Sequence, residues 1–291
     1  MAFQRLVRFQ APEHARYGDL LSETAEGYLV QPLVGSIASG FQRSSEDGIL
    51  VPSLLCPVAE TPIIICVGLN YQQHAQEAKV APFFPFSLVY ALTPFKLTVP
   101  PYPVIFTKPG TALAGPHDPV HVHPSAQSML DYEGELTFIT ARDAKNLPED
   151  FDLADYILGY TAGNDVSARN FQLPEASGGQ FCYAKSFDTF APIGPAIVSP
   201  AVILDPQKLR YMVRVNGEIR QETGTDDMIW SVRQILRHIT QGTTVKAGTV
   251  VMTGTPSGVG FFQKRFLSHG DTVEVEVEGV AKLVSTVEFE S

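Results

Sequence analysis

The sequence predicts a mixed, β-rich α+β fold, with a small β-rich domain at residues 1–58 and a larger domain at residues 59–291. Short apolar stretches recur along the chain, many of them alternate apolar with polar residues, and turn residues separate them. That pattern is typical of β-strands. Residues 228–240 instead carry apolar side chains at helical spacing, so we expect an amphipathic helix there. A length of 291 residues suits one large domain with a small appendage.

The predicted elements follow one another from the N-terminus. Three apolar stretches, RLVRF, EGYLVQPL and DGILVPSLL, predict strands of the small domain. The run IIICVGL predicts a buried strand that opens the larger domain, the polar NYQQHAQEAK suits a helix, and YPVIFTK predicts the next strand. In RYMVRVNGEIRQE, Asn216-Gly217 predicts a two-residue hairpin turn. The alternation in DTVEVEVEGVAKLVSTVEFE predicts a closing β-hairpin.

Composition argues against some classes of partner. The formal net charge of −10 argues against binding to nucleic acid or to an anionic membrane, since both require a basic surface. The N-terminus has no secretory signal pattern, and no run is long enough to span a membrane. Three widely spaced cysteines, Cys56, Cys66 and Cys182, form no disulfide framework. We therefore expect a reducing compartment, the cytoplasm first and the mitochondrion as the alternative.

The stretch LDYEGELTF raises the first question about function. It predicts a strand, so Asp131, Glu133 and Glu135 would share one face. A solvated face is one interpretation, although like charges in a row repel each other. The other is a bound hard divalent cation such as Mg²⁺ or Ca²⁺, which prefers carboxylate oxygens. The closing stretch EVEVEG has the same spacing without site-like neighbours, and we interpret it as a solvated face.

Two segments offer a further acid and a lysine. In YTAGNDVSARNFQ, Asp165 follows a strand end and would complete a three-carboxylate site with two acids of LDYEGELTF. Alternatively, Asp165 caps a helix over SARNFQ. Lys185, in AKSFDTF, is either a buried ammonium with a role in catalysis or binding, or an ordinary surface lysine. His121 and His123 share a strand face but supply only two local ligands for a transition metal.

Two other segments suggest an anion site and a base. The loop VMTGTPSGVG, with Gly254 beside Thr255, could present backbone N–H groups to an anion, or be a plain turn. In LNYQQHAQEAK, His74 and Glu77 would share a helix face. The carboxylate could then orient the imidazole as a general base. An exposed polar helix is the alternative interpretation.

Seven segments, in this order, resemble the fumarylacetoacetate hydrolase family. They are VGLNYQQHAQE, YPVIFTKP, DYEGEL, TAGNDVSARNFQ, KSFDTFAPIGP, VNGE and TGTPSGVG. The resemblance runs from about Ile63 to Glu288, and the ordered set is specific although each segment is weak alone. It is closest to the small domain-containing branch, which is acylpyruvate hydrolase-like and oxaloacetate tautomerase-like. The resemblance implies a β-roll of several sheets with a small N-terminal domain, and a homodimer.

The resemblance also implies a metal site. In the family, Mg²⁺ or Mn²⁺ is held by residues that match Glu133, Glu135 and Asp165, while Asp131 would be a supporting neighbour. Two of the three acids in LDYEGELTF would then be explained by a bound cation. The implied substrate is a small anionic 2-oxo acid, whose carboxylate and 2-oxo oxygens can chelate such an ion.

Catalytic and substrate-binding residues are implied in the same way. Lys185 matches the family's active-site lysine, and His74 with Glu77 matches a dyad carried on a lid that orders over substrate. Contacts to substrate are implied for Arg169, Gln172, Gly254 and Thr255.

Three reactions could follow from these parts. The first expectation is Mg-dependent hydrolysis of a C–C bond in a 2,4-dioxo acid of the acylpyruvate or fumarylpyruvate type. In it, His74 deprotonates water, Lys185 stabilises the oxyanion, and an enolate stabilised by the metal leaves. Without attack by water, the site would act as an oxaloacetate keto–enol tautomerase, and loss of CO₂ would make it a decarboxylase. A non-catalytic, metal-dependent binder with a disabled lid is the alternative outside enzymes.

The sequence departs from the family pattern at residues 80–96. The 17-residue apolar stretch VAPFFPFSLVYALTPFK, with three prolines, follows EAK directly. We hypothesise a retained intron, because valine codons begin with GT and the lysine codon AAG ends in AG, as an intron does. The alternative is a genuine lid or membrane-docking insertion. Either origin puts closure of the lid in question, since the stretch directly follows the helix with His74 and Glu77.

Overall fold

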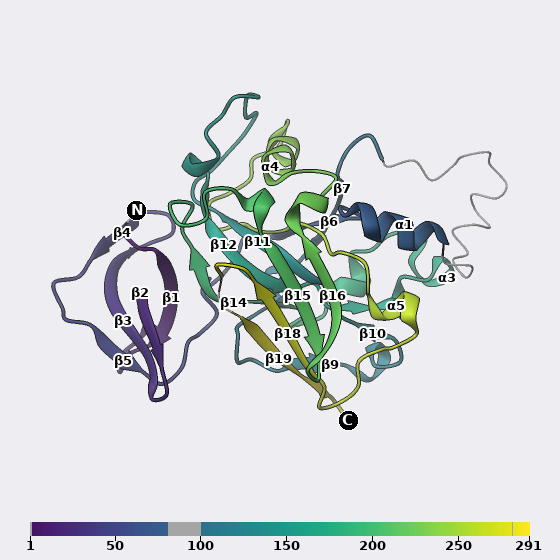
Figure 1. The fold of residues 1–291 in the computed structure, drawn as a ribbon, viewed down its shortest axis with the longest axis horizontal. Helices are drawn as coiled ribbons and strands as arrows, with labels where there is room; N and C mark the ends of the chain where they lie inside the picture. The colour runs from purple at the N-terminus through teal and green to yellow at the C-terminus, as the bar shows by residue number, and fades with distance from the viewer. Residues whose placement is uncertain (1, 81–99, 281) are drawn as a thin grey trace.

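Strands dominate the fold, and the helices are short. The computed structural model describes residues 2–80, 100–280 and 282–291. Its α-helices are α1 (Gln72–Val80), α3 (Pro174–Ser177), α4 (Val232–Thr240) and α5 (Gly260–Gln263). The strands form a twelve-stranded, a five-stranded and a two-stranded sheet in the described residues. The predicted mixed, β-rich α+β fold is therefore confirmed (Figure 1).

The largest sheet joins the N-terminal strands to the rest of the chain. Its order is β4-β3-β2-β1-β14-β12-β11-β17-β6-β7, with β5 paired to β3 and β8 paired to β14. The bounds are β1 (Arg5–Gln10), β2 (Ala15–Thr24), β3 (Gly27–Ser36), β4 (Gly40–Arg43), β5 (Ile49–Val51), β6 (Ile64–Gly68), β7 (Val104–Lys108), β8 (Leu113–Ala114), β11 (Gly134–Thr140), β12 (Ile157–Asn164), β14 (Ala191–Val198) and β17 (Val250–Met252). Backbone pairing of β1 with β14 connects the N-terminal strands to the larger part. The domain boundary at residue 58 stays a prediction.

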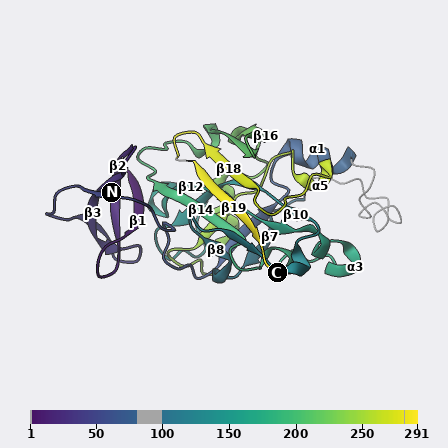
Figure 2. The same cartoon turned by 90° about the horizontal axis from the view of Figure 1, so that it is seen from below.

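The two ends of the molecule differ in what they carry. Figures 1 and 2 both show β1, β2 and β3 at one end and α1, α3 and α5 at the other. No helix in the described ranges is long and apolar enough to cross a membrane.

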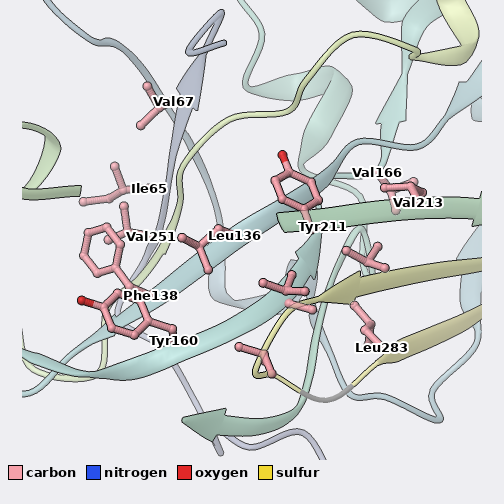
Figure 3. Close-up of a cluster of buried hydrophobic side chains, with 14 of the residues drawn as sticks. Ile65, Val67, Leu136, Phe138, Tyr160, Val166, Tyr211, Val213, Val251 and Leu283 are labelled. Carbon is pink, nitrogen blue, oxygen red and sulfur yellow. The ribbon is translucent and has the colours of Figure 1, made fainter. Parts of the chain in front are cut away.

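A second sheet packs against the largest one and encloses the main core. Its order is β16-β15-β18-β19-β9, and its strands are β9 (Val120–Val122), β15 (Arg210–Val215), β16 (Glu218–Gly224), β18 (Thr272–Val277) and β19 (Leu283–Phe289). Buried side chains of both sheets meet in this core, among them Phe138 of β11, Tyr160 of β12 and Tyr211 of β15 (Figure 3). Burial of this apolar surface stabilises the arrangement. It thereby fixes β11 and β12, which lead to the acidic residues described below.

The predicted helix and both predicted hairpins are present. Helix α4 buries the apolar residues that share its inner face, and Ser231 forms a capping box with Gln234 at its start. Strands β15 and β16 meet at Asn216-Gly217, where φ is 51° and 80°, as a type I′ turn requires. Strands β18 and β19 pair antiparallel. The polar segment NYQQHAQEAK contains α1.

The stretch LDYEGELTF is not one continuous strand, so this part of the prediction is wrong. Leu130–Asp131 forms β10, which pairs with β13 (Ser167–Ala168), whereas β11 begins only at Gly134. The physical reason is that Asp131 is bonded to a different segment. Its carboxylate accepts hydrogen bonds from the backbone N–H groups of Gly260 (2.8 Å) and Phe261 (3.0 Å).

The acids of EVEVEG do form a solvated face, as predicted. The valines of β18 are buried, while Glu276 is exposed. Glu276 pairs with Arg214 (2.7 Å) and Glu274 pairs with Lys282 (3.0 Å). The predicted insertion at residues 80–96 lies outside the described residues, apart from Val80 at the end of α1.

Candidate functional site

Three buried carboxylates lie together where β11 begins and β12 ends. Glu133, Glu135 and Asp165 each offer one oxygen, and these atoms lie within 4.8 Å of one another. The residue between the two glutamates is Gly134. A larger residue does not fit there, because its Cβ would lie 2.2 Å from a side-chain carbon of β15. The antiparallel pairing of β11 with β12 brings Asp165 beside them. The structure thus brings the three predicted metal ligands together.

Lys185 bridges two of these carboxylates. It ends a 3₁₀ helix (Tyr183–Lys185) and is 2 % exposed, so the interpretation as a surface lysine is wrong. Its Nζ donates to Glu133 Oε2 (2.9 Å), Asp165 Oδ2 (2.7 Å) and Ser167 Oγ (2.8 Å). Burial disfavours the ammonium, but the charges of Asp165 and Glu133 outweigh burial and raise the pKa of Lys185. In this arrangement Lys185 is a charged donor and not a base.

Asp165 does not cap a helix, and that alternative is wrong. The segment SARNFQ forms β13 and a 3₁₀ turn (Arg169–Phe171), which begins after Ala168 without a side-chain cap. Both oxygens of Asp165 instead face lysines. Oδ2 accepts from Lys185, and Oδ1 lies 2.5 Å from Lys108 Nζ.

Lys108 is a buried charge that the sequence analysis missed. It ends β7, is 1 % exposed, and also donates to the backbone carbonyl oxygens of Val166 (3.2 Å) and Phe190. The burial pattern of VIFTK alternates toward its end, which places Phe106 and Lys108 on the inward face. The sequence gives no comparable signal, because Val104, Ile105 and Phe106 are all apolar and do not show which face of the strand Lys108 takes.

Arg169 is surrounded by acceptors from its own chain. Its Nε donates to Asp131 Oδ2 (2.7 Å), its Nη2 lies 2.6 Å from Glu133 Oε1, and its Nη1 donates to Gln172 Oε1 (2.8 Å). Arg169 therefore contacts the acidic cluster and Gln172, and substrate contact stays a prediction for both residues. Asp131 supports Glu133 through this guanidinium.

The two glutamates of the cluster differ in their electrostatics. Burial disfavours ionisation of Glu133, but the charges of Lys185 and Arg169 outweigh it and lower the pKa of Glu133 to about 2. Burial, together with the charges of Asp165 and Glu133, raises the pKa of Glu135 well above its usual range. Glu135 is thus the carboxyl for which the protein itself supplies too little positive charge.

The glycine-rich loop is bonded directly to the acidic cluster, and is more than a turn between strands. The N–H of Gly254 donates to Glu135 Oε2 (2.6 Å). The hydroxyl of Thr255 donates to the carbonyl oxygen of Gly134 (3.0 Å) and accepts from Gln221 Nε2 (2.8 Å). Both predicted substrate contacts therefore lie at the site, with the Thr255 hydroxyl bonded within the chain.

His74 and Glu77 form the predicted pair on α1. Nδ1 of His74 lies 3.1 Å from Glu77 Oε2, and His74 is 8 % exposed, so α1 is not simply an exposed polar helix. The N–H of Gly258 donates to both oxygens of Glu77 (3.1 and 3.2 Å). The same loop bonds to Glu135 through the N–H of Gly254, so it links the pair to the acidic cluster. The pair therefore belongs to the same site as the acidic cluster.

The side chains present fit a hard divalent cation. All three candidate ligands are carboxylates, the donors that Mg²⁺ and Mn²⁺ prefer. The buried cluster contains four carboxylates and three basic side chains: Asp131, Glu133, Glu135, Asp165, Lys108, Arg169 and Lys185. With all of them ionised, one negative charge is left over, which agrees with the raised pKa of Glu135. A divalent cation would reverse that excess to one positive charge.

The histidines of PVHVHP lie elsewhere. His121 faces Glu288 (3.7 Å) and His123 bonds to Ser125 (2.8 Å). Within the described residues, the acidic cluster is the one group of three or more potential metal ligands.

Comparison with known proteins identifies the family. Residues 63–288 match the family model described as Fumarylacetoacetate (FAA) hydrolase C-terminal. The chain belongs to the fumarylacetoacetate hydrolase family. It is 36 % identical to a mitochondrial oxaloacetate tautomerase of Xenopus laevis, over 81 % of this chain and 68 % of that protein.

Solved structures of this family cover nearly the whole chain. A 5-carboxymethyl-2-hydroxymuconate delta-isomerase from Mycobacterium smegmatis is 30 % identical, with a TM-score of 0.79 over 98 % of this chain and 100 % of its own. A fumarylacetoacetate hydrolase from Exiguobacterium antarcticum is also 30 % identical, with a TM-score of 0.73 over 98 % of this chain and 99 % of its own. The chain thus belongs to a family of enzymes, and the expected family is confirmed.

Proposed function

We propose that this chain is a divalent-cation-dependent enzyme that enolises a small 2-oxo acid. The reaction we favour is keto–enol tautomerisation of oxaloacetate or a related 2-oxo dicarboxylic acid. The observation that carries the proposal is the buried cluster of Glu133, Glu135 and Asp165 beside the ammonium of Lys185. The names of two relatives, a tautomerase and an isomerase, support it, since neither reaction breaks a C–C bond.

Charge favours an anionic substrate at this site. With all its groups ionised the cluster carries one negative charge, and a bound Mg²⁺ or Mn²⁺ would make it positive by one. Such a cation would also act as a Lewis acid toward a substrate carbonyl oxygen. In a buried site, one uncompensated positive charge attracts a carboxylate strongly, because the effective dielectric constant is low.

The protein's own groups can move the proton. His74, held by Glu77, can accept a proton from the carbon next to the carbonyl. Lys185, charged and buried, can donate a hydrogen bond to the oxygen on which negative charge develops. Delivery of one proton to that oxygen completes the conversion of ketone to enol. No other bond needs to break.

Hydrolysis of a C–C bond is the second candidate. The same His74–Glu77 pair could deprotonate a water, which would then attack the second carbonyl of a 2,4-dioxo acid. The similarity to a fumarylacetoacetate hydrolase favours keeping this candidate. Decarboxylation of oxaloacetate would use the same enolate.

One experiment separates these reactions. The purified chain is mixed with the enol form of oxaloacetate, and loss of enol absorbance is followed with Mg²⁺ and with chelator. Proton NMR of the same mixtures reports pyruvate from decarboxylation. A parallel sample with acetylpyruvate reports acetate and pyruvate from hydrolysis. We expect faster enol loss with Mg²⁺ only, without pyruvate.

Matched variants test the assigned residues. His74→Gln should slow the reaction at least about a hundredfold, as expected for loss of a general base. His121→Gln changes an exposed histidine and should have no effect. Equal rates with Mg²⁺ and with chelator would reject the metal-dependent mechanism. Metal binding without turnover of either substrate would support the non-catalytic binder.

The assembly and location stay proposals as well. We propose a homodimer, with a small anionic 2-oxo acid as ligand and with neither nucleic acid nor membrane as partner. The net charge of −10 supports the latter two exclusions. The mitochondrial relative makes the mitochondrion a candidate location beside the cytoplasm.

A further inference from the structure

Each of the three carboxylates is also held by a group other than Lys185. For Glu133 and Asp165 this group is a basic side chain, and for Glu135 it is a backbone N–H. Nη2 of Arg169 lies 2.6 Å from Glu133 Oε1, and the N–H of Gly254 donates to Glu135 Oε2 at 2.6 Å. Nζ of Lys108 lies 2.5 Å from Asp165 Oδ1. Lys108 therefore contacts Asp165 in the same way as Arg169 contacts Glu133: each is a second basic side chain on a carboxylate that Lys185 also binds.

Lys108 is itself fixed on several sides. Its Nζ donates to the carbonyl oxygens of Val166 and Phe190, which flank the site on two different segments. Its backbone is held in the β6–β7 pair, where Lys108 lies opposite Ile64. Its neighbour on the inward face, Phe106, places its ring 5.0 Å from Lys185 Nζ. Strand β7 thus supports both lysines of the site.

We propose that Lys108 is a positioning residue for the metal ligand Asp165. This inference rests on the proposed function, because it assumes that Asp165 binds the cation. Lys108 is 1 % exposed, and its Nζ contacts Asp165 and two backbone carbonyl oxygens. By holding Oδ1, it directs Oδ2 toward the space shared with Glu133 and Glu135. Among the described residues Oδ1 has no hydrogen-bond partner, and the ion pair with Lys108 is the contact found for it.

A purely structural role would have a different signature. If Lys108 only filled a buried space and bonded to two carbonyl oxygens, replacing it would lower stability whatever residue stood at position 165. If it acts through Asp165, its effect on metal affinity depends on the carboxylate at 165. A double-mutant cycle measures this dependence.

The test is Mg²⁺ titration by calorimetry on the full chain after removal of metal with chelator. The proteins are wild type, Lys108→Met, Asp165→Asn and the double variant. Loss of a group that orients a metal ligand typically costs about 10- to 100-fold in affinity. We expect a loss of that size for Lys108→Met in the wild-type background. In the Asp165→Asn background, the same change should alter affinity by less than about threefold.

Controls keep the outcome decisive. Lys246→Met removes an exposed lysine that pairs with Asp143, and should leave Mg²⁺ affinity unchanged. If Lys108→Met is not folded by circular dichroism, Lys108→Gln replaces it, since its amide can still donate to the carbonyl oxygens. If binding to Asp165→Asn is too weak for calorimetry, Mn²⁺ binding is measured by electron paramagnetic resonance.

Three results are informative. A loss confined to the background with Asp165 supports the proposal. Unchanged affinity in Lys108→Met, or an equal loss in both backgrounds, overturns it while the metal site stands. Absence of Mg²⁺ and Mn²⁺ binding by wild type overturns the proposed function, and this inference with it.

Discussion

Glu135 differs from the other two carboxylates of the site in having no cation within hydrogen-bonding distance among the described residues. Glu133 contacts Lys185 and Arg169, and Asp165 contacts both lysines. Within the part of the chain that the structure describes, the Glu135 carboxylate accepts from the N–H of Gly254 alone. Burial and the neighbouring acids therefore raise the pKa of Glu135. A bound divalent cation would supply the missing positive charge.

This imbalance predicts how stability depends on pH without metal. A carboxyl group whose pKa is raised in the folded state binds its proton more tightly in the folded chain than in the unfolded chain. Its contribution to the free energy of unfolding therefore falls as pH rises from the unfolded pKa, about 4.3, through the folded one. In chelator, we expect wild type to lose up to about 1.4 kcal/mol per pH unit relative to Glu135→Gln in that window.

Urea denaturation between pH 5 and pH 8 measures this difference. With Mg²⁺ in excess, the cation favours the ionised form of Glu135, so the loss should shrink or reverse. A pH profile identical for wild type and Glu135→Gln in chelator would contradict the prediction.

Asp131 is the second residue for which a strong effect is expected. Its carboxylate accepts from Arg169 and from the N–H groups of Tyr132, Gly260 and Phe261. Asp131→Asn removes one of the two carboxylates that face the buried Arg169 guanidinium and should destabilise the chain by up to about 3–5 kcal/mol, the cost of breaking a buried ion pair. The exposed Glu276→Gln is the control and should change stability by less than about 0.5 kcal/mol. Urea denaturation at fixed pH compares the two.

Some of these residues could be predicted from the sequence and others could not. The type and spacing of Glu133 and Glu135 suggested a metal site, and motif order added Asp165 and Lys185. The contact of Lys108 with Asp165 was not predictable, because it joins residues 57 positions apart through packing of β7 against the loop after β12. Its inward direction was not visible either, because the three residues before Thr107 are all apolar.

At the scale of elements, α1 and the glycine-rich loop act as one unit. The N–H of Gly258 donates to Glu77, and Glu77 contacts His74. Gly258 has φ +101°, and a Cβ there would lie 2.1 Å from the carbonyl oxygen of Arg220. This glycine therefore allows the loop to approach α1 and β16 closely.

Gly258→Ala should displace the loop and with it Glu77. We expect activity to fall about tenfold to a hundredfold, because small misplacements of a catalytic group are costly. Gly270→Ala is the matched control. Its φ is +84°, and nothing lies within 4 Å of a Cβ there, so it carries the backbone strain without the clash. Equal activity of the two variants would argue against a role for the loop in orienting the pair.

Regular elements were predictable where one periodicity dominates. Alternation predicted the hairpin of β18 and β19, and helical spacing predicted the helix of residues 228–240, of which α4 forms the part from Val232 to Thr240. The break between β10 and β11 was not predictable, because alternation continues through Tyr132. It is caused by bonds from Asp131 to Gly260 and Phe261, which lie about 130 residues away in sequence.

At the scale of the whole molecule, the site depends on segments from most of the chain. Helix α1 supplies the His74–Glu77 pair, β11 and the end of β12 supply the acids, and a 3₁₀ helix supplies Lys185. Strand β7 adds Lys108. Residues 80–96 begin with Val80, the last residue of α1, and the others lie between α1 and β7 in the sequence, two elements that both reach the site.

The hypothesis of a retained intron predicts that residues 80–96 are dispensable. Deleting them joins Lys79 to Leu97 and leaves seven residues, 97–103, before β7 begins at Val104. A connection of that length is ordinary between neighbouring elements. The deleted chain should fold, and its Mg²⁺-dependent enol loss should equal or exceed that of the full chain, since a connection of ordinary length would then join α1 to β7. The same deletion with His74→Gln is the control and should be inactive.

Transcripts that read directly from Lys79 to Leu97 would support the hypothesis independently. Transcripts that all include the segment, together with an unfolded or inactive deletion variant, would show that the segment is a genuine part of the enzyme.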